Sequence, residues 1–92
     1  MASIVTYDIP EKHRELKKIL FELGYKDQIP GEKCKIIFFP NTTLYHPSKT
    51  PEQLREDVQA VCKRLSIHLE RCIATPWGPA WAAICGEDFK SN

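Results

Sequence analysis

Asp8 is the residue of this 92-residue chain whose type and position most directly suggest chemistry. It closes the apolar run Ile4-Val5-Thr6-Tyr7 and stands before a segment with helical periodicity. A carboxylate at the end of a strand and near a helix N-terminus can bind Mg²⁺ or Mn²⁺ through its oxygens. In a symmetric dimer, two such carboxylates can hold one ion between them. The alternative is a structural role, because Asp often accepts backbone N–H bonds in a turn.

A basic segment follows Asp8 and could contact the phosphates of RNA or DNA. The alternative is a solvated helix face, because acidic residues are interspersed and dilute the local charge. The net charge of the chain does not distinguish these alternatives, because it is only +1, from 13 Lys and Arg and 12 Asp and Glu. The candidate phosphate-binding residues are Lys12, Arg14, Lys17 and Lys18.

Trp77 is a further candidate for binding. It lies in the sequence Pro76-Trp77-Gly78-Pro79, which is typical of a turn. An exposed indole in a turn can stack on nucleic-acid bases or anchor a protein interface. Trp81 falls within the next apolar run, where a core or dimer contact is expected.

The cysteines and histidines form no recognisable metal-ligand set. The chain has four cysteines, and none belongs to a Cys-x-x-Cys pair or has a His at zinc-ligand spacing. We expect four reduced core thiols, with a metal site or a disulfide pair as the alternative. His46 lies in a predicted loop, and no Ser or Cys has an identifiable partner base. The cysteines are Cys34, Cys62, Cys72 and Cys85.

Two amphipathic helices are expected to position these residues. The first begins near Pro10 or Glu11, and its apolar residues recur at helical spacing until Gly24 ends it. The second begins at Thr50, where the Thr at the N-cap and Gln53 three residues later form a capping box.

Strand signals surround the two helices. Residues 4–7, 34–39 and 67–74 are β-branched or apolar runs, 25–28 is a weaker candidate, and 80–85 is expected as a short final strand. The order predicts an α+β fold: a ferredoxin-like βαββαβ sandwich, with two helices on one face of an antiparallel sheet and an extra C-terminal strand. Residues 1–92 fit one domain.

No apolar run approaches the ~20 residues that span a membrane, and the N-terminus does not resemble a signal peptide. We therefore expect a cytoplasmic protein in a reducing compartment. Because so short a chain buries a modest core, pairing as a homodimer is a natural supplement to its stability.

The segment Ile4-Val5-Thr6-Tyr7-Asp8-Ile9-Pro10, followed by a basic helix that ends at Leu23-Gly24-Tyr25, resembles the small CRISPR-associated endonuclease family and its stand-alone toxin and antitoxin relatives. The resemblance implies a βαββαβ fold and a homodimer. It also implies that Asp8, paired with its twin, binds a divalent ion for cutting phosphodiester bonds, or survives in a non-catalytic DNA-binding subunit.

Three functions are thus open from the sequence. The first is a homodimeric nucleic-acid-interacting protein, in its catalytic form a Mg²⁺- or Mn²⁺-dependent endonuclease centred on Asp8. The second is a non-catalytic protein-interaction or antitoxin-like module that uses sheet edges and Trp77. The third, a small-ligand sensor, rests on fold analogy alone.

Overall fold

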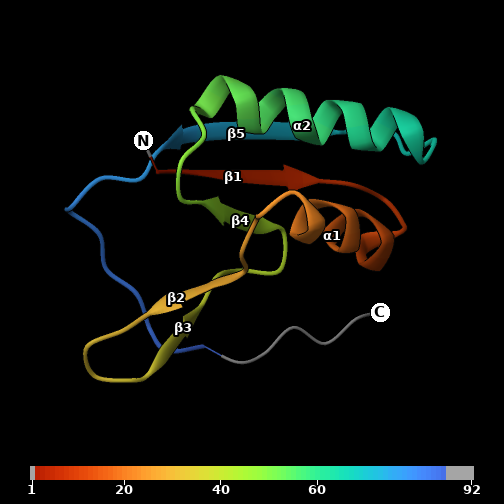
Figure 1. Cartoon of the computed structure of the whole chain (residues 1–92). Coiled ribbons are helices and arrows are strands. Elements are labelled where there is room, and N and C mark those ends of the chain that lie inside the picture. Colours follow the sequence, from red (N-terminus) through yellow and green to blue (C-terminus); the bar gives the residue numbers. More distant parts are fainter. Residues whose placement is uncertain (1, 87–92) are drawn as a thin grey trace.

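The computed structural model describes residues 2–86. Its elements form one α+β arrangement in which a small sheet, two helices and a hairpin follow one another along the chain (Figure 1). In order they are β1 (Ser3–Asp8), α1 (His13–Glu22), β2 (Gln28–Pro30), β3 (Ile36–Phe38), β4 (Thr43–His46), α2 (Pro51–Arg64) and β5 (Arg71–Pro76).

The main sheet has three strands in the order β4-β1-β5, and both pairs are antiparallel. β1 is therefore central and β5 lies at an edge. An isolated antiparallel bridge joins Lys26 to Tyr45 on the outer side of β4, at the position where the sequence predicted a weak strand over 25–28. The regular strand β2 starts later than predicted and pairs with β3 in a separate two-stranded hairpin.

Helix α2 forms as the sequence predicts. The Thr50 hydroxyl accepts a hydrogen bond from the Gln53 backbone N–H, and the Gln53 side chain accepts one from the Thr50 N–H. Helix α1 begins later than predicted, at His13, because Lys12 before it adopts a left-handed backbone with φ of 60°. It ends just before Gly24, whose φ of +93° is a conformation that glycine tolerates best.

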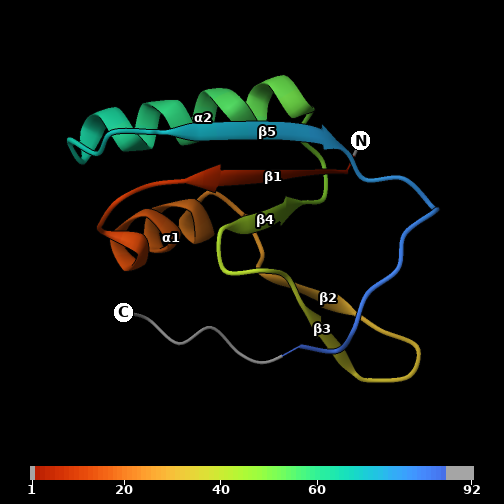
Figure 2. The ribbon, with the colours of Figure 1, turned by 180° about the vertical axis from the view of Figure 1, so that it is seen from behind.

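Alternation along β1 decides where the core lies. Val5 and Tyr7 are buried and belong to one hydrophobic cluster with Leu16 of α1 and Leu54 of α2, whereas Thr6 between them is exposed. Both helices thus pack on the same face of the sheet. Figure 2 shows the other side, where β5 passes in front of α2 and β1 lies beside β5. We call the sheet face turned away from the helices the open face.

The predicted C-terminal strand over 80–85 is wrong. Residues 77–86, the C-terminal segment, follow β5 without regular structure and pass beside the β2–β3 hairpin (Figure 1). The segment is attached at both ends, because the Trp77 N–H donates to the Ala2 carbonyl at 2.9 Å and the Phe38 N–H donates to the Cys85 carbonyl at 3.0 Å.

The cysteines also depart from the prediction. Cys34 and Cys85 form a disulfide across 51 residues of sequence, so the expectation of four reduced thiols is wrong for this pair. Cys62 and Cys72 are free and lie in or against the core, as expected. Burial raises the pKa of both thiols, which keeps them protonated and poorly reactive.

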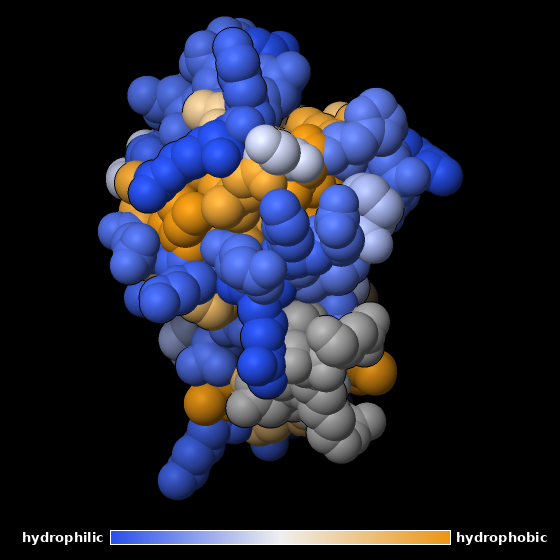
Figure 3. Space-filling model, turned by 90° about the vertical axis from the view of Figure 1, so that its right-hand side faces the viewer, coloured by the Kyte–Doolittle hydropathy of each residue, from blue (hydrophilic) through white to orange (hydrophobic). Residues whose placement is uncertain are grey.

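None of the described helices is long and apolar enough to cross a membrane. Hydrophilic side chains cover most of the side of the molecule in Figure 3, and an apolar band lies between them. Burial of apolar surface is therefore incomplete on this side, as expected for a chain of 92 residues.

Candidate functional site

The open face of the sheet carries both polar and apolar side chains. Ile4 and Thr6 of β1 alternate with the buried core residues and point to this face. On the neighbouring β5, Ile73 lies opposite Thr6 and is 69% exposed. Thr43 of β4 donates a hydrogen bond to the Thr6 hydroxyl at 3.2 Å, which pairs the two hydroxyls at the centre of the face.

An aromatic cluster lies at the end of this face where β1 begins. It consists of Phe39, Tyr45, Trp77 and Trp81. The Trp77 ring packs edge-on against Phe39 and Tyr45, with centroid distances of 5.6 and 6.3 Å. Trp81 contacts Trp77 at 5.0 Å with its ring tilted by 37°. Edge-to-face and offset arrangements of this kind add attraction beyond the buried area.

The two tryptophans differ from the expectation in exposure. Trp77, predicted as the exposed one, is partly buried at the centre of the aromatic cluster, and Trp81, expected as a core or dimer contact, is 43% exposed and thus outside the core. The reason is the missing final strand. Because residues 80–85 do not pair in a sheet, the Trp81 side chain lies over Trp77 instead of entering the core.

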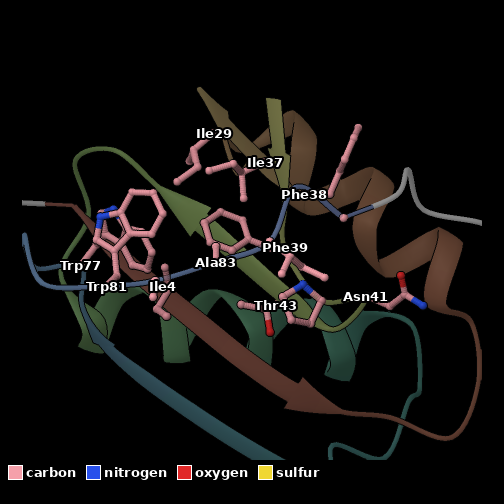
Figure 4. A pocket seen from close by; sticks show the side chains of 14 residues that line it. Ile4, Ile29, Ile37, Phe38, Phe39, Asn41, Thr43, Trp77, Trp81 and Ala83 are labelled. Atoms are coloured by element: carbon pink, nitrogen blue, oxygen red, sulfur yellow. The ribbon is translucent and has the colours of Figure 1, made fainter. Parts of the chain in front are cut away.

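A cavity of about 630 Å³ lies beside the aromatic cluster. The open face, the β2–β3 hairpin and the C-terminal segment all contribute to its walls. In Figure 4, Trp77 and Trp81 lie side by side at one end of the cavity and Asn41 lies at the other, with Ile29 and Ile37 on the hairpin above. Within the described part of the chain, the lining side chains are apolar or aromatic except for Asn41 and Thr43.

Asp8 lies at the opposite end of β1 from the aromatic cluster. Its side chain is 52% exposed, and its Oδ2 lies 3.3 Å from Nε of Arg71, the residue beside it on β5. Among residues 2–86 no three His, Cys, Asp or Glu side chains come together in a way that could hold a metal ion. Arg71 is thus the charged neighbour of the Asp8 carboxylate.

The structure does not bring the predicted nucleic-acid residues onto one surface. Arg14 and Lys18 are exposed on α1, which packs on the helical side of the sheet, whereas Trp77 lies at the open face. Lys12 is exposed, and its ammonium group donates to the Leu65 carbonyl at 2.9 Å. Lys17 is only 3% exposed, in contrast to the other three predicted phosphate contacts.

His46 is a structural residue. It is 7% exposed in β4, its Nδ1 accepts from the backbone N–H groups of Ser48 and Lys49, and its Nε2 lies 3.2 Å from the Leu23 carbonyl. Since Nδ1 accepts, Nε2 carries the proton and donates to Leu23. The ring thus connects the end of α1 to the turn before α2.

Tyr25 packs beside His46, with the two ring centroids 5.0 Å apart. Its hydroxyl donates to Asp57 Oδ2 at 2.8 Å, and the Lys49 ammonium group reaches that oxygen at 2.7 Å. Burial, followed by the bond to Asp57, raises the pKa of Tyr25 far above its ordinary value. These bonds join Tyr25, which follows α1, and Lys49, which precedes α2, to Asp57 of α2, so the Asp57 carboxylate is engaged in a structural network.

The sequence reasoning missed the cavity side of the hairpin. From the sequence, Phe39 is placed in a predicted strand, and Tyr45 and Ile29 are given no binding role. The available signal was the density of aromatic and β-branched residues in residues 36–39 beside two tryptophans at 77 and 81. That composition does not show that residues 36–39 and the two tryptophans come into contact, because the contact forms only in the folded chain.

Comparisons with known proteins leave the assignment to the site itself. No family model matches the chain, and neither the search of curated proteins nor the search of solved structures found a match. The open face, the aromatic cluster and the cavity are therefore the features that bear on function.

Proposed function

We propose that this chain is a non-catalytic recognition domain that self-associates through its open face. The observation that carries the proposal is the apolar side chain of Ile73, which is 69% exposed on the edge strand β5. Isolated apolar residues on a surface are ordinary, but here the edge strand also offers unpaired backbone groups. A second copy of the chain could cover Ile73 and pair with the backbone groups of β5. The two copies would then form the homodimer that the short length of the chain favours.

The proposal includes a ferredoxin-like core. The sheet order β4-β1-β5 with antiparallel pairs, the bridge from Lys26 to Tyr45 beyond β4, and two helices on one face support it. In this interpretation residues near Lys26 are a reduced second strand, and the β2–β3 hairpin is an insertion between the second and third strands of the βαββαβ pattern.

Light scattering coupled to size-exclusion chromatography tests the dimer. The wild-type protein is expected to elute at twice its monomer mass of 10.6 kDa. Ile73→Lys should convert it to a monomer, because a buried unpaired ammonium group would oppose the contact. Gln59→Lys adds the same charge at an exposed position of α2 and should leave the dimer intact. A monomeric wild type, or an Ile73→Lys variant that stays dimeric, would refute the proposal.

A second candidate keeps the resemblance to the CRISPR-associated endonucleases. The observation that favours it is the half-exposed Asp8 carboxylate at the end of β1, which a second copy could approach. In such a dimer the two Asp8 side chains would bind Mg²⁺ or Mn²⁺ and cut RNA or DNA, with Lys12, Arg14 and Lys18 near the phosphates. In the cytoplasmic location expected for such a protein, the Cys34–Cys85 disulfide would be exposed to cellular reductants.

Asp8→Asn tests this candidate cleanly. The Asp8–Arg71 pair is exposed, so its loss should change stability by less than about 1 kcal/mol. Cleavage of single-stranded RNA or double-stranded DNA that requires both the metal ion and Asp8 would establish the nuclease. Equal cleavage by wild type and Asp8→Asn, or none by either, would exclude Asp8 as its centre.

A further inference from the structure

The cavity at the open face has the dimensions of a small-molecule site. Its volume of about 630 Å³ lies within the range of roughly 300–1,000 Å³ that ligand pockets occupy. Its walls come from three parts of the chain that are far apart in sequence: β1 and β4, the hairpin, and the C-terminal segment. Ile73, which carries the proposed dimer contact, is not among its lining residues.

The polarity of the lining defines which ligands can enter. Among residues 2–86, no Asp, Glu, Lys, Arg or His side chain lines the cavity. A charged ligand would lose its hydration here without gaining an opposite charge, which is strongly unfavourable. The polar side chains of the lining are Asn41 and Thr43, and Asn41 is exposed at one end (Figure 4). They can serve one hydrogen-bonding group of the ligand.

The aromatic side chains favour a ligand with rings. Phe39, Trp77 and Trp81 line one part of the cavity, and their mutual contacts are edge-on or tilted, which leaves ring faces and edges for a further partner. A planar ring can add to such an arrangement in the same offset or edge-on geometry. Ile29 and Ile37, both 9% exposed, close the hairpin side with aliphatic surface.

The disulfide holds the cavity in shape. Cys85 lies in the C-terminal segment and Cys34 before β3, so the bond between them fixes the segment to the hairpin. The Phe38 N–H donates to the Cys85 carbonyl beside it. Gly86 follows with a φ of +76°, and an added Cβ there would lie 3.2 Å from the Phe38 carbonyl oxygen. A wall that is already fixed loses less entropy when a ligand binds.

We propose that this cavity binds an uncharged, ring-bearing apolar small molecule, and that the Cys34–Cys85 disulfide maintains the site by fixing the C-terminal segment over it. The inference rests on the recognition role proposed above and names its ligand class, but it does not require the dimer. Reduction of the disulfide would release the wall that carries Trp81 and Ala83 and would weaken binding.

Two fluorescent probes of matched ring structure test the ligand class. N-phenyl-1-naphthylamine is uncharged, and 1-anilinonaphthalene-8-sulfonate carries a sulfonate on the same rings. With the oxidised full-length protein we expect saturable binding of the neutral probe and at least about tenfold weaker binding of the anionic one. Equal affinities, or no saturable binding of the neutral probe, would overturn the inference.

Variants of the C-terminal segment locate the site. Ala83→Phe places a ring in the cavity and should abolish binding of the neutral probe, whereas Ala80→Phe, on the same segment but outside the lining, should not. Cys85→Ser and reduction of the wild type should each weaken binding by at least about tenfold. If Ala83→Phe bound the probe as wild type does, the cavity would not be the site. A dimer sensitive to Ile73→Lys would then still support the proposed self-association on its own.

Discussion

At the scale of single residues, two buried tyrosines show how the same group can stabilise or destabilise the fold. Tyr25 is 3% exposed, and its hydroxyl is bonded to Asp57 at 2.8 Å. Tyr7 is 2% exposed, and its hydroxyl has no hydrogen-bond partner among the described residues. A satisfied bond to a charged group contributes to stability, whereas a buried unpaired hydroxyl carries a desolvation penalty.

Removal of each hydroxyl should therefore have opposite effects on the free energy of unfolding. We expect Tyr25→Phe to lower it by about 1.5–3 kcal/mol, because Asp57 loses a donor. Tyr7→Phe should leave it unchanged or raise it by up to about 2 kcal/mol, because the ring stays and the unpaired group leaves. Chemical denaturation of the matched variants gives both values. A loss of equal size in the two variants would show that Tyr7 has a partner.

The same two residues should make the protein unstable at alkaline pH. Burial raises the pKa of both tyrosines above the ordinary value of about 10. The unfolded chain then releases these protons first, so their contribution is complete below about pH 10 and is lost as the pH rises above it, at up to about 1.4 kcal/mol per pH unit for each. Denaturation between pH 8 and 11 should show this decline, and a Tyr7→Phe/Tyr25→Phe double variant should flatten it. An unchanged slope would contradict the assignment.

At the scale of elements, features that depend on residues close in sequence could be predicted, and features that depend on residues far apart in sequence could not. Thr50, Pro51 and Gln53 lie within one turn, so the start of α2 could be derived from local chemistry alone. The segment 80–85 has an equally clear apolar pattern, but a strand also needs a neighbour, and no spacing rule says which edge is free. The cysteine pairing failed for the same reason, because 51 residues separate Cys34 from Cys85.

The capping box at the start of α2 should contribute measurably to the stability of the fold. Thr50→Ala removes the acceptor of the Gln53 N–H at the first turn of α2 and should lower the free energy of unfolding by about 1 kcal/mol. Thr50→Ser keeps the hydroxyl and should lose far less. Thermal and chemical denaturation measure both. If the two variants were equally destabilised, the effect would come from the methyl group of Thr50 and the hydrogen bond would have little weight.

At the scale of the whole molecule, the chain covers the two faces of its sheet by different means. The helices cover one face with a continuous core, which joins β1 to α1 and α2. The open face is covered only in part, by a segment without regular structure that the disulfide and two backbone hydrogen bonds attach. The position of Asp8 could be predicted because it follows from the end of β1. The cavity could not, because it exists only when the hairpin and the C-terminal segment meet.

The disulfide should therefore stabilise the whole fold as well as the cavity. Closing a loop across 51 residues restricts the unfolded chain, and the chain-entropy estimate is about 4 kcal/mol before any native strain. Thiol titration in denaturant should find two free thiols in the oxidised protein and four after reduction. Reduction, or Cys34→Ser, should lower the free energy of unfolding, whereas Cys72→Ser, at a free cysteine, should leave the response to reductant intact. Four free thiols before reduction, in protein handled without reductant, would show that the bond does not form and that the C-terminal segment is held by its hydrogen bonds alone.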